Sequence, residues 1–242
     1  MYLRNAWYVA AWDSEIGREP LGRILLGEPV VFYRGIDGKP VGLADRCCHR
    51  GLPLSLGRVE GDRIRCGYHG LAFDANGACV EVPGQPRIPP GATVRTYPLV
   101  ERWRLLWIWM GDPARADASS IPNWWFMNHP DWKLVPGNGA KPLPTKCNYE
   151  MVVDNLMDLS HLTFVHTSTI GNDEILRFPV RTEREADRVR MTRLMPDVAP
   201  PPFYKMAGNF KGNVDRWQIV EGILPCAVDV DVGCTEVGVG AM

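Results

Sequence analysis

The sequence predicts an N-terminal all-β domain followed by an α+β domain. Roughly the first 110 residues read as short apolar strands separated by turn signals, and none of them shows a 3.6-residue period over three turns. Residues 147–167 contain no Gly or Pro and carry apolar side chains at a helical spacing. The remaining segments again read as strands, so a helix precedes a sheet in the second domain.

Turn signals divide the first half into hairpins. The loop GIDGKP lies between the apolar runs VVFYR and VGLAD, and Asn76-Gly77 lies between two alternating segments, which is the strongest short hairpin signal. RLLWIWMGDP predicts an aromatic strand that ends at its Gly-Asp-Pro. Residues 111–122 are small, polar and bounded by proline, which is typical of a linker. We therefore expect domains at 1–115 and 116–242.

Composition excludes several classes of function. With 242 residues the chain has room for two domains, and its net charge of −1 gives no electrostatic case for nucleic acid or an anionic membrane. No window holds the roughly 20 apolar residues of a membrane-spanning helix, and the N-terminus lacks signal-peptide features. We expect a cytoplasmic protein. Seven cysteines, an odd number, then favour metal ligation over a disulfide framework.

The first candidate site combines two cysteines and two histidines. Cys47 and His49 form C-x-H, and Cys66 and His69 form C-x-x-H after an intervening stretch. Two cysteines and two histidines suit tetrahedral zinc or a Rieske [2Fe–2S] cluster. Each loop contributes one thiol and one imidazole, which favours the Rieske cluster, because zinc motifs tend to pair Cys with Cys and His with His. A zinc site and a chance clustering of these residues remain alternatives. Cys48 is expected to be a packed thiol rather than a ligand.

The second candidate site lies in DNLMDLSHLTFVH. His161 and His166 are five residues apart, which turns the second side chain by about 140° on a regular helix. Both can reach one ion only if the helix is distorted or ends between them. Two histidines on an apolar helix are more often structural than metal-binding. An oxygen-activating iron would instead require two histidines and one carboxylate.

A family resemblance connects the two sites. The motif C-x-H-x16-C-x-x-H, followed by GLAFD and preceded by RNAWYVA, resembles the Rieske domain of aromatic-ring oxygenase α subunits. The chain is similar to vanillate and dicamba O-demethylases over its whole length. The second segment matches N-x-x-D-x-x-H-x4-H, a pattern of the same family.

The resemblance implies a fold and a first set of ligands. The fold would be an N-terminal all-β Rieske domain and an incomplete α+β helix-grip (START/Bet v1-like) catalytic domain. Cys47 and Cys66 would bind one iron of the [2Fe–2S] cluster, and His49 and His69 would bind the other.

It also implies a mononuclear non-haem Fe(II) held by His161 and His166. Asn155 and Asp158 would be catalytic members of this motif. The Asp158 carboxylate would hydrogen-bond the free ring nitrogen of His161. It would also bridge to His69 of a neighbouring subunit in a homotrimer and so carry the electron between protomers.

The third iron ligand is missing from the expected place. In the family it is a carboxylate on a late helix, whereas this chain ends in what reads as a strand. We expect a C-terminally truncated chain, with the third ligand beyond Met242. The carboxylates still available in the second half are Asp197, Asp215, Asp229, Asp231 and Glu236.

The implied reaction is O2- and NAD(P)H-dependent hydroxylation. Electrons would come from a separate flavin and iron–sulfur reductase or a ferredoxin, and the outcome would be O-demethylation of a methoxylated or methyl-substituted aromatic acid. Alternatives are a ring-hydroxylating dioxygenase α subunit, a truncated form that retains only Rieske electron transfer, a ferredoxin-like carrier, and an inactive remnant. The sequence does not name the substrate.

Overall fold

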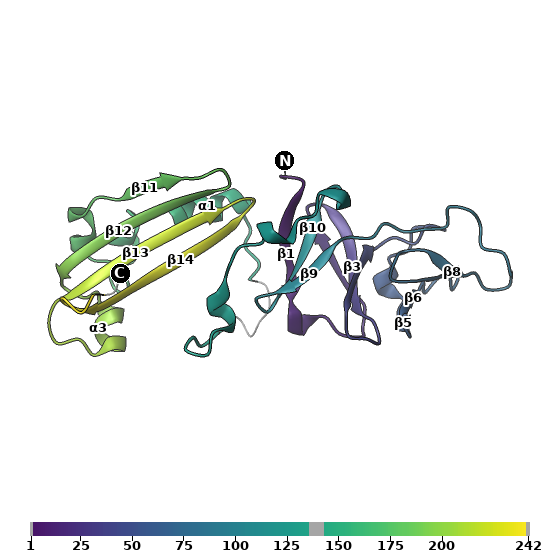
Figure 1. The fold of residues 1–242 in the computed structure, drawn as a ribbon, viewed down its shortest axis with the longest axis horizontal. Helices are drawn as coiled ribbons and strands as arrows, with labels where there is room; N and C mark the ends of the chain where they lie inside the picture. Colours follow the sequence, from purple (N-terminus) through teal and green to yellow (C-terminus); the bar gives the residue numbers. More distant parts are fainter. Residues whose placement is uncertain (1, 136–142, 241–242) are drawn as a thin grey trace. The chain divides into compact units, whose positions relative to one another are not determined.

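The computed structural model describes residues 2–135 and 143–240 (Figure 1). The chain divides into two compact units, Met1–Pro144 and Thr145–Met242. This division lies later than the boundary expected near residue 115. No helix within the described ranges has the length and hydrophobicity that a membrane span needs.

The first unit is built from three antiparallel sheets, ordered β1-β10-β9, β2-β3-β4 and β5-β6-β7-β8. The expected hairpins form, at the turn between β3 and β4 and at the turn between β7 and β8. The strands are β1 Ala6–Trp12, β2 Leu21–Leu25, β3 Glu28–Arg34, β4 Pro40–Ala44, β5 Arg58–Glu60, β6 Arg63–Arg65, β7 Ala72–Phe73, β8 Cys79–Glu81, β9 Leu99–Arg102 and β10 Leu105–Met110. The short 3₁₀ helices are η1 Asp13–Glu15, η2 Leu54–Leu56, η3 Pro113–Arg115, η4 Ala118–Ser120 and η5 Trp125–Asn128.

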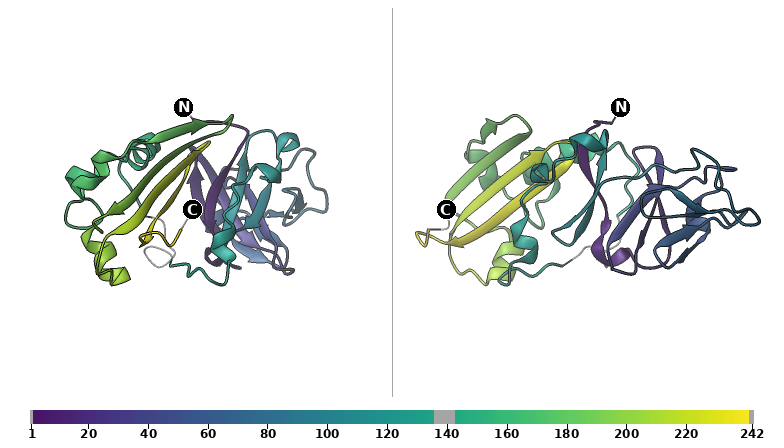
Figure 2. Two further views of the ribbon diagram at one scale, coloured as in Figure 1. Left: turned by 60° about the vertical axis from the view of Figure 1, so that its left-hand side comes forward. Right: turned by 45° about the vertical axis from the view of Figure 1, so that its right-hand side comes forward.

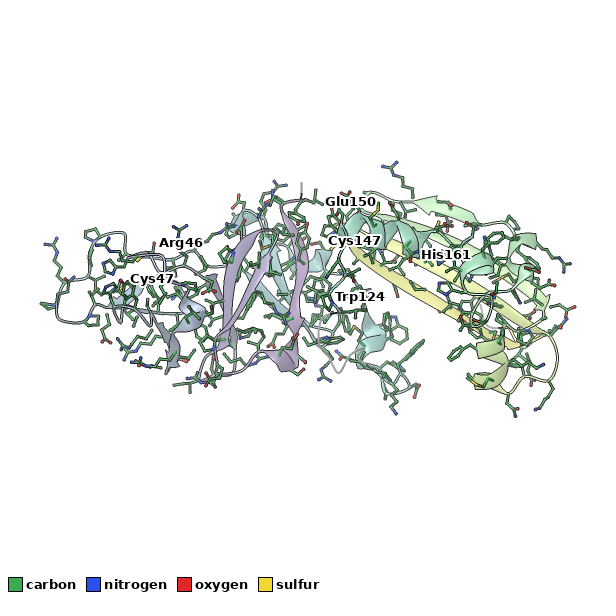
Figure 3. All side chains as sticks on the ribbon, turned by 180° about the vertical axis from the view of Figure 1, so that it is seen from behind. Arg46, Cys47, Trp124, Cys147, Glu150 and His161 are labelled. Atoms are coloured by element: carbon green, nitrogen blue, oxygen red, sulfur yellow. The ribbon has the colours of Figure 1, made fainter. Side chains whose placement is uncertain are left out.

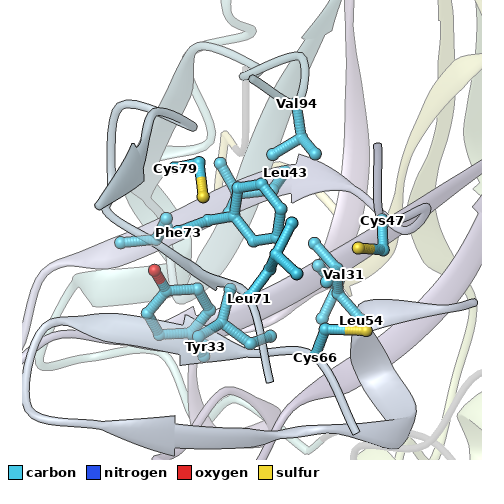
Figure 4. Close-up of a cluster of buried hydrophobic side chains, with 12 residues drawn as sticks. Val31, Tyr33, Leu43, Cys47, Leu54, Cys66, Leu71, Phe73, Cys79 and Val94 are labelled. Atoms are coloured by element: carbon cyan, nitrogen blue, oxygen red, sulfur yellow. The ribbon is translucent and has the colours of Figure 1, made fainter. Parts of the chain in front are cut away.

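Strand β3 is buried on both faces and connects two core clusters. Val30 and Phe32 pack with side chains of β1 and β10, whereas Val31 and Tyr33 point into a second cluster that includes Phe73. Successive side chains of a strand point to opposite faces, so a continuous apolar run serves both clusters. The second cluster includes residues from the two loops that carry the Cys and His motifs (Figure 4).

The segment predicted as a linker, residues 111–122, packs onto the first unit instead. Ile121 is buried with Trp107 of β10, and the indole of Trp7 donates to the carbonyl of Asp117 over 2.8 Å. The linker prediction is therefore wrong. The outer face of β10 is aromatic and needs a cover, and this segment supplies one despite its polar composition.

The second unit is an antiparallel sheet with helices on one face (Figure 2). Its strands follow the order β11-β12-β13-β14, with α1 packed over β13 and β14. The elements are α1 Tyr149–Met157, α2 Leu162–Val165, η7 Asp173–Arg177, β11 Arg181–Arg184, β12 Arg188–Val198, α3 Pro202–Gly208, β13 Val214–Ile223 and β14 Ala227–Glu236. An all-β unit followed by an α+β unit is the predicted fold class.

Alternation along β13 creates the core of the second unit. Val214 and Val220 are fully buried on the helix-facing side, and they pack with Leu159, Leu162 and Ile175. The segment that carries the two histidines therefore rests on this face of the sheet.

Candidate metal centres

The first loop of the candidate cluster site connects β4 to η2. The amide of Cys47 donates to the carbonyl of Leu52 over 2.9 Å, and the amide of Gly51 donates to the carbonyl of Cys47 over 2.9 Å. Gly51 has φ +73°, a left-handed conformation that glycine adopts without strain. The turn closes on itself and presents its thiol inward.

The second loop, between β6 and β7, repeats this arrangement. The amide of Cys66 donates to the carbonyl of Leu71 over 2.8 Å, and Gly70 donates to the carbonyl of Cys66 over 3.2 Å. Gly70 has φ +75°, and an added Cβ there would lie 2.8 Å from Cγ of Pro83. Both motifs thus form the same turn, each with a cysteine first and a left-handed glycine four residues later.

The two turns converge, with sulfur inside and imidazole outside. Cys47 and Cys66 are 3% and 2% exposed, and both lie at one side of the core cluster while Cys79 lies at the other (Figure 4). His49 and His69 are exposed, and their ring centroids are 4.5 Å apart. Two buried thiols beside two accessible imidazoles fit the donor set that a [2Fe–2S] cluster with one sulfur-ligated and one nitrogen-ligated iron requires.

The thiol environment affects how a metal would enter. Burial raises the pKa of the Cys47 thiol to about 11, a backbone hydrogen bond with His49 opposes the shift, and the adjacent Cys66 thiol adds to it. Without metal this thiol is therefore protonated at neutral pH, and cluster binding must release its proton. Cys48 is exposed, so the expectation that it packs is wrong.

Arg65 supports the second loop, a role that the sequence did not reveal. Its guanidinium donates to the carbonyl of Gly70 over 2.7 Å and forms ion pairs with Glu60 over 2.7 Å and Glu81 over 2.9 Å. The arginine thereby connects the glycine of the loop to strands β5 and β8. Tyr68 adds a ring contact to His69, with centroids 3.8 Å apart.

Replacing Arg65 with glutamine is expected to flatten the acid dependence of the first unit's stability. Hydrogen bonds from Arg65 are the largest cause that holds the pKa of Glu81 and of Glu60 below the ordinary value of 4.5. Their stabilisation is present above pH 4.5 and is lost as the pH falls through the lowered folded-state pKa. Urea unfolding between about pH 3 and about pH 6 measures this dependence.

The matched control is Arg87→Gln, an exposed arginine with no ion pair in the described ranges. It should keep the wild-type slope of unfolding free energy against pH. Equal slopes for wild type and Arg65→Gln would contradict the assignment.

The second candidate site lies where the predicted helix breaks. One helix was expected over residues 147–167, but α1 ends at Met157 and a separate turn, α2, follows. Figure 3 labels Glu150, which belongs to α1, and His161, which comes after α1 ends. Asp158 has an extended ψ of 94°, and its carboxylate accepts the Ser160 amide over 2.9 Å and the Ser160 hydroxyl. Such a local side-chain bond competes with the helical pattern.

This break explains how two histidines five residues apart can lie close together. His161 immediately precedes α2 and His166 immediately follows it, and their ring centroids are 5.3 Å apart. The Val165 amide donates to the carbonyl of His161 over 2.8 Å, and that of His166 donates to the carbonyl of Leu162 over 3.1 Å. A single helical turn thus brings both imidazoles to one place.

The tautomer of His161 follows from its hydrogen bond. Its Nδ1 contacts the backbone carbonyl oxygen of Asp158, so the predicted bond to the carboxylate is wrong; Ser160 takes that carboxylate instead. A carbonyl oxygen only accepts, so Nδ1 carries a hydrogen, and in the neutral ring the lone pair therefore lies on Nε2. His161 is oriented to bind a metal through Nε2.

The carboxylates considered for the third ligand lie elsewhere. Within residues 2–135 and 143–240, no three His, Cys, Asp or Glu side chains lie close enough to hold one ion. Asp215 accepts the amides of Asp197 and Gly238, and Asp231 accepts the indole of Trp217. Asn155 is exposed on α1. The structure therefore groups His161 with His166 and adds no third ligand among the described residues.

Family comparisons agree with both halves of the chain. The Rieske [2Fe-2S] domain family matches residues 6–98, and the vanillate O-demethylase oxygenase C-terminal domain family matches residues 145–242. These two domains define the class of protein: an iron–sulfur oxygenase component with an all-β electron-transfer domain and a separate catalytic domain.

Individual relatives agree over nearly the whole chain. The toluene-4-sulfonate monooxygenase system iron-sulfur subunit of Comamonas testosteroni is 44% identical, over 100% of this chain and 70% of that protein. The vanillate O-demethylase oxygenase subunit of Pseudomonas sp. (strain HR199 / DSM 7063) is 40% identical, over 99% of this chain and 68% of that protein. The crystal structure of dicamba monooxygenase bound to dicamba matches with a TM-score of 0.89 and 34% identity, over 100% of this chain and 70% of that chain.

The chain belongs to the Rieske non-haem iron oxygenases, in the family of the vanillate O-demethylase oxygenase subunits. Its cofactors are a [2Fe–2S] cluster and a mononuclear non-haem iron, and its electrons come from a separate reductase or ferredoxin. The predicted family, fold class and enzyme class are confirmed.

Proposed function

We propose that this chain is the oxygenase component of a monooxygenase system that hydroxylates a substituted aromatic acid and removes a methyl group from it. Two relatives carry names of aromatic acids, toluene-4-sulfonate and vanillate. For a methyl ether, O2, NAD(P)H and a proton would give the free hydroxyl compound, formaldehyde, water and NAD(P)+.

The observation that carries the proposal is the pair of matching turns in the first unit. Cys47 and Cys66 would hold the buried iron of the [2Fe–2S] cluster, and His49 and His69 would hold the other iron. The rings of His49 and His69 are exposed. Electrons from the reductase would therefore enter and leave the cluster at the imidazole side, where a partner can approach.

The second unit would hold the iron that meets substrate. His161 would bind through Nε2, because the Asp158 carbonyl fixes its Nδ1 hydrogen, and His166 would bind from the other end of α2. When bound, Fe(II) supplies the activation of O2. The roles of the chain's own residues are to keep the two imidazoles together and to hold the proton on Nδ1.

Assembly as a cytoplasmic homotrimer is part of the proposal. The Asp158 carboxylate and the His69 imidazole belong to exposed residues, so a contact between the two from different subunits is sterically open. Asn155 lies three residues before Asp158 on the exposed face of α1 and would belong to the same surface. Light scattering of the purified chain measures the subunit number.

Turnover and iron content together test the proposed function. The purified chain is supplied with O2, NADH and a reductase, with vanillate and toluene-4-sulfonate as probes. Three irons per chain and substrate-dependent NADH use are expected, with formaldehyde released from vanillate. A cis-diol product would instead indicate a dioxygenase.

Two irons per chain without substrate oxidation would contradict the proposal. That result would favour the alternative of Rieske electron transfer alone. The observation in favour of this alternative is that the described residues place no third ligand beside His161 and His166.

A further inference from the structure

Two arginines are buried beneath the histidine segment of the second unit. Arg193 of β12 and Arg216 of β13 are 5% and 2% exposed, and neither forms an ion pair with any residue that the structure describes. Nε of both guanidiniums and Nη1 of Arg216 have no hydrogen-bond partner among the described residues. Burial of a guanidinium without a carboxylate partner is costly, and replacing a buried charge with an apolar side chain of similar volume is often neutral or stabilising.

Each of these arginines donates one hydrogen bond to the backbone of the histidine segment. Arg193 Nη1 donates to the carbonyl of Leu159 over 3.3 Å, and Arg216 Nη2 donates to the carbonyl of Ile170 over 2.8 Å. Leu159 precedes His161 by two residues, and Ile170 follows His166 by four. The two carbonyls therefore bracket the candidate iron ligands.

Each guanidinium has a second contact that fixes its position. Arg193 Nη1 also donates to Oε1 of Gln218 over 3.2 Å, and Gln218 lies opposite Arg193 in the β12–β13 register. The guanidinium of Arg216 lies 5.1 Å from the ring centroid of Tyr204 in α3. Contacts with Gln218 of β13 and Tyr204 of α3 thus hold the two guanidiniums in place.

The histidine segment needs such support, because α2 is a single turn. Four residues form too few internal hydrogen bonds for a stable helix. The Leu159 carbonyl lies between α1 and α2, outside either helical pattern, and a buried carbonyl without a donor is unfavourable. Thr163 adds one local bond, from its hydroxyl to the carbonyl of Asn172 over 3.2 Å. The arginines connect both ends of the segment to the sheet.

The charge of these arginines persists despite burial. Burial lowers the pKa of both, and the Asp158 carboxylate opposes the shift at Arg193. Arginine starts from so high a pKa that it remains a cation at neutral pH. A charged donor forms a stronger bond to a carbonyl than a neutral one, which suits a fixed anchor.

We propose that Arg193 and Arg216 are positioning residues that hold both ends of the His161–His166 segment on the sheet, so that the two imidazoles can share one metal ion. The part that concerns the metal rests on the proposed function. The anchoring itself concerns only this chain and can be measured without metal at the histidines.

The test uses the full chain with its [2Fe–2S] cluster and a metal-depleted histidine site. Arg193→Met and Arg216→Met remove the donors, and the corresponding lysine substitutions keep a charged donor. Arg190→Met is the matched control, because Arg190 lies on the same strand but is exposed and pairs with Glu221. Amide hydrogen exchange is followed over residues 159–171, with β12 and β13 as the internal reference.

Both methionine variants are expected to exchange at least tenfold faster over 159–171, with sheet amides unchanged. Their affinity for Co(II), measured by its visible absorption, should fall by about 10- to 100-fold, the usual cost of losing a group that supports a ligand. The lysine variants should lie closer to wild type, and Arg190→Met should equal it.

Unchanged exchange over 159–171 in the methionine variants would overturn the proposal. So would loss of sheet protection in both the methionine and lysine variants, since the arginines would then stabilise the whole unit. If wild type fails to bind Co(II), the metal role of the histidines fails, whereas the exchange measurement still decides whether the arginines anchor the segment.

Discussion

Replacing Cys47 with serine is expected to abolish the [2Fe–2S] cluster. The red-brown absorption and the Rieske EPR signal should disappear, and iron should fall by two per chain. Cys47 and Cys66 provide the two buried sulfurs where the two turns meet, and a serine hydroxyl is a poor substitute for a thiolate on iron. Metal analysis and EPR of the reduced protein measure this result.

Cys48→Ser is the matched control for that experiment. The Cys48 thiol neighbours Cys47 in sequence but is exposed, so its replacement should leave the cluster intact. Retention of the cluster in Cys47→Ser, or its loss in Cys48→Ser, would contradict the ligand assignment. A colourless wild-type protein with bound zinc would contradict the Rieske assignment itself.

Replacing His161 with alanine is expected to remove the mononuclear iron and reduce substrate turnover by at least about 100-fold. The substitution deletes the imidazole whose Nε2 is left free to bind metal. The Rieske EPR signal should persist, because the proposed Rieske ligands belong to the other compact unit. Iron analysis should therefore show the loss of one iron per chain.

His129→Ala is the control, because this histidine is partly exposed and lies near Asp131 rather than near another histidine. It should keep full turnover. Wild-type turnover in His161→Ala would exclude this histidine as an iron ligand. Loss of the Rieske signal in the same variant would indicate misfolding. The His166→Ala variant would then test whether the histidine pair binds the mononuclear iron.

Local sequence signals predicted the turns well. The Asn76-Gly77 hairpin forms as expected: Gly77 has φ +75°, and an added Cβ would lie 2.1 Å from the carbonyl oxygen of Val94. Asp74 closes the same turn by accepting the amides of Asn76 and Ala78 over 2.9 Å. Turn conformation depends on a few adjacent residues, so the sequence carries enough information to specify it.

Longer elements were less predictable. The apolar spacing over residues 147–167 indicated one helix, but the side chain of Asp158 binds Ser160 and ends α1. Residues 111–122 have the composition of a linker, yet Ile121 packs against the aromatic face of β10 in a buried cluster. In both places a contact that composition and periodicity do not encode decided the outcome.

The buried arginines show most clearly that composition alone does not predict which side chains are buried. RVRMTRLM reads as a strand, and because arginine is rarely buried, its composition gives no sign that Arg193 faces the core. The pairing of β12 with β13 turns Arg193 toward Gln218 and the helix side. A register shift of one residue would point it to the other face, so its burial is set by strand pairing.

The sequence by itself determined the ligand types, their spacing and the order of the two domains, because these are properties of adjacent residues. Only the tertiary structure decided that the thiols are buried while the imidazoles are exposed, and that a carbonyl rather than a carboxylate orients His161. It also decided that Arg193 and Arg216 lie under the histidines. The arginine contacts join residues far apart in the chain, and at His161 the local backbone offers two oxygens of Asp158; in each case packing selects among the partners that a sequence leaves open.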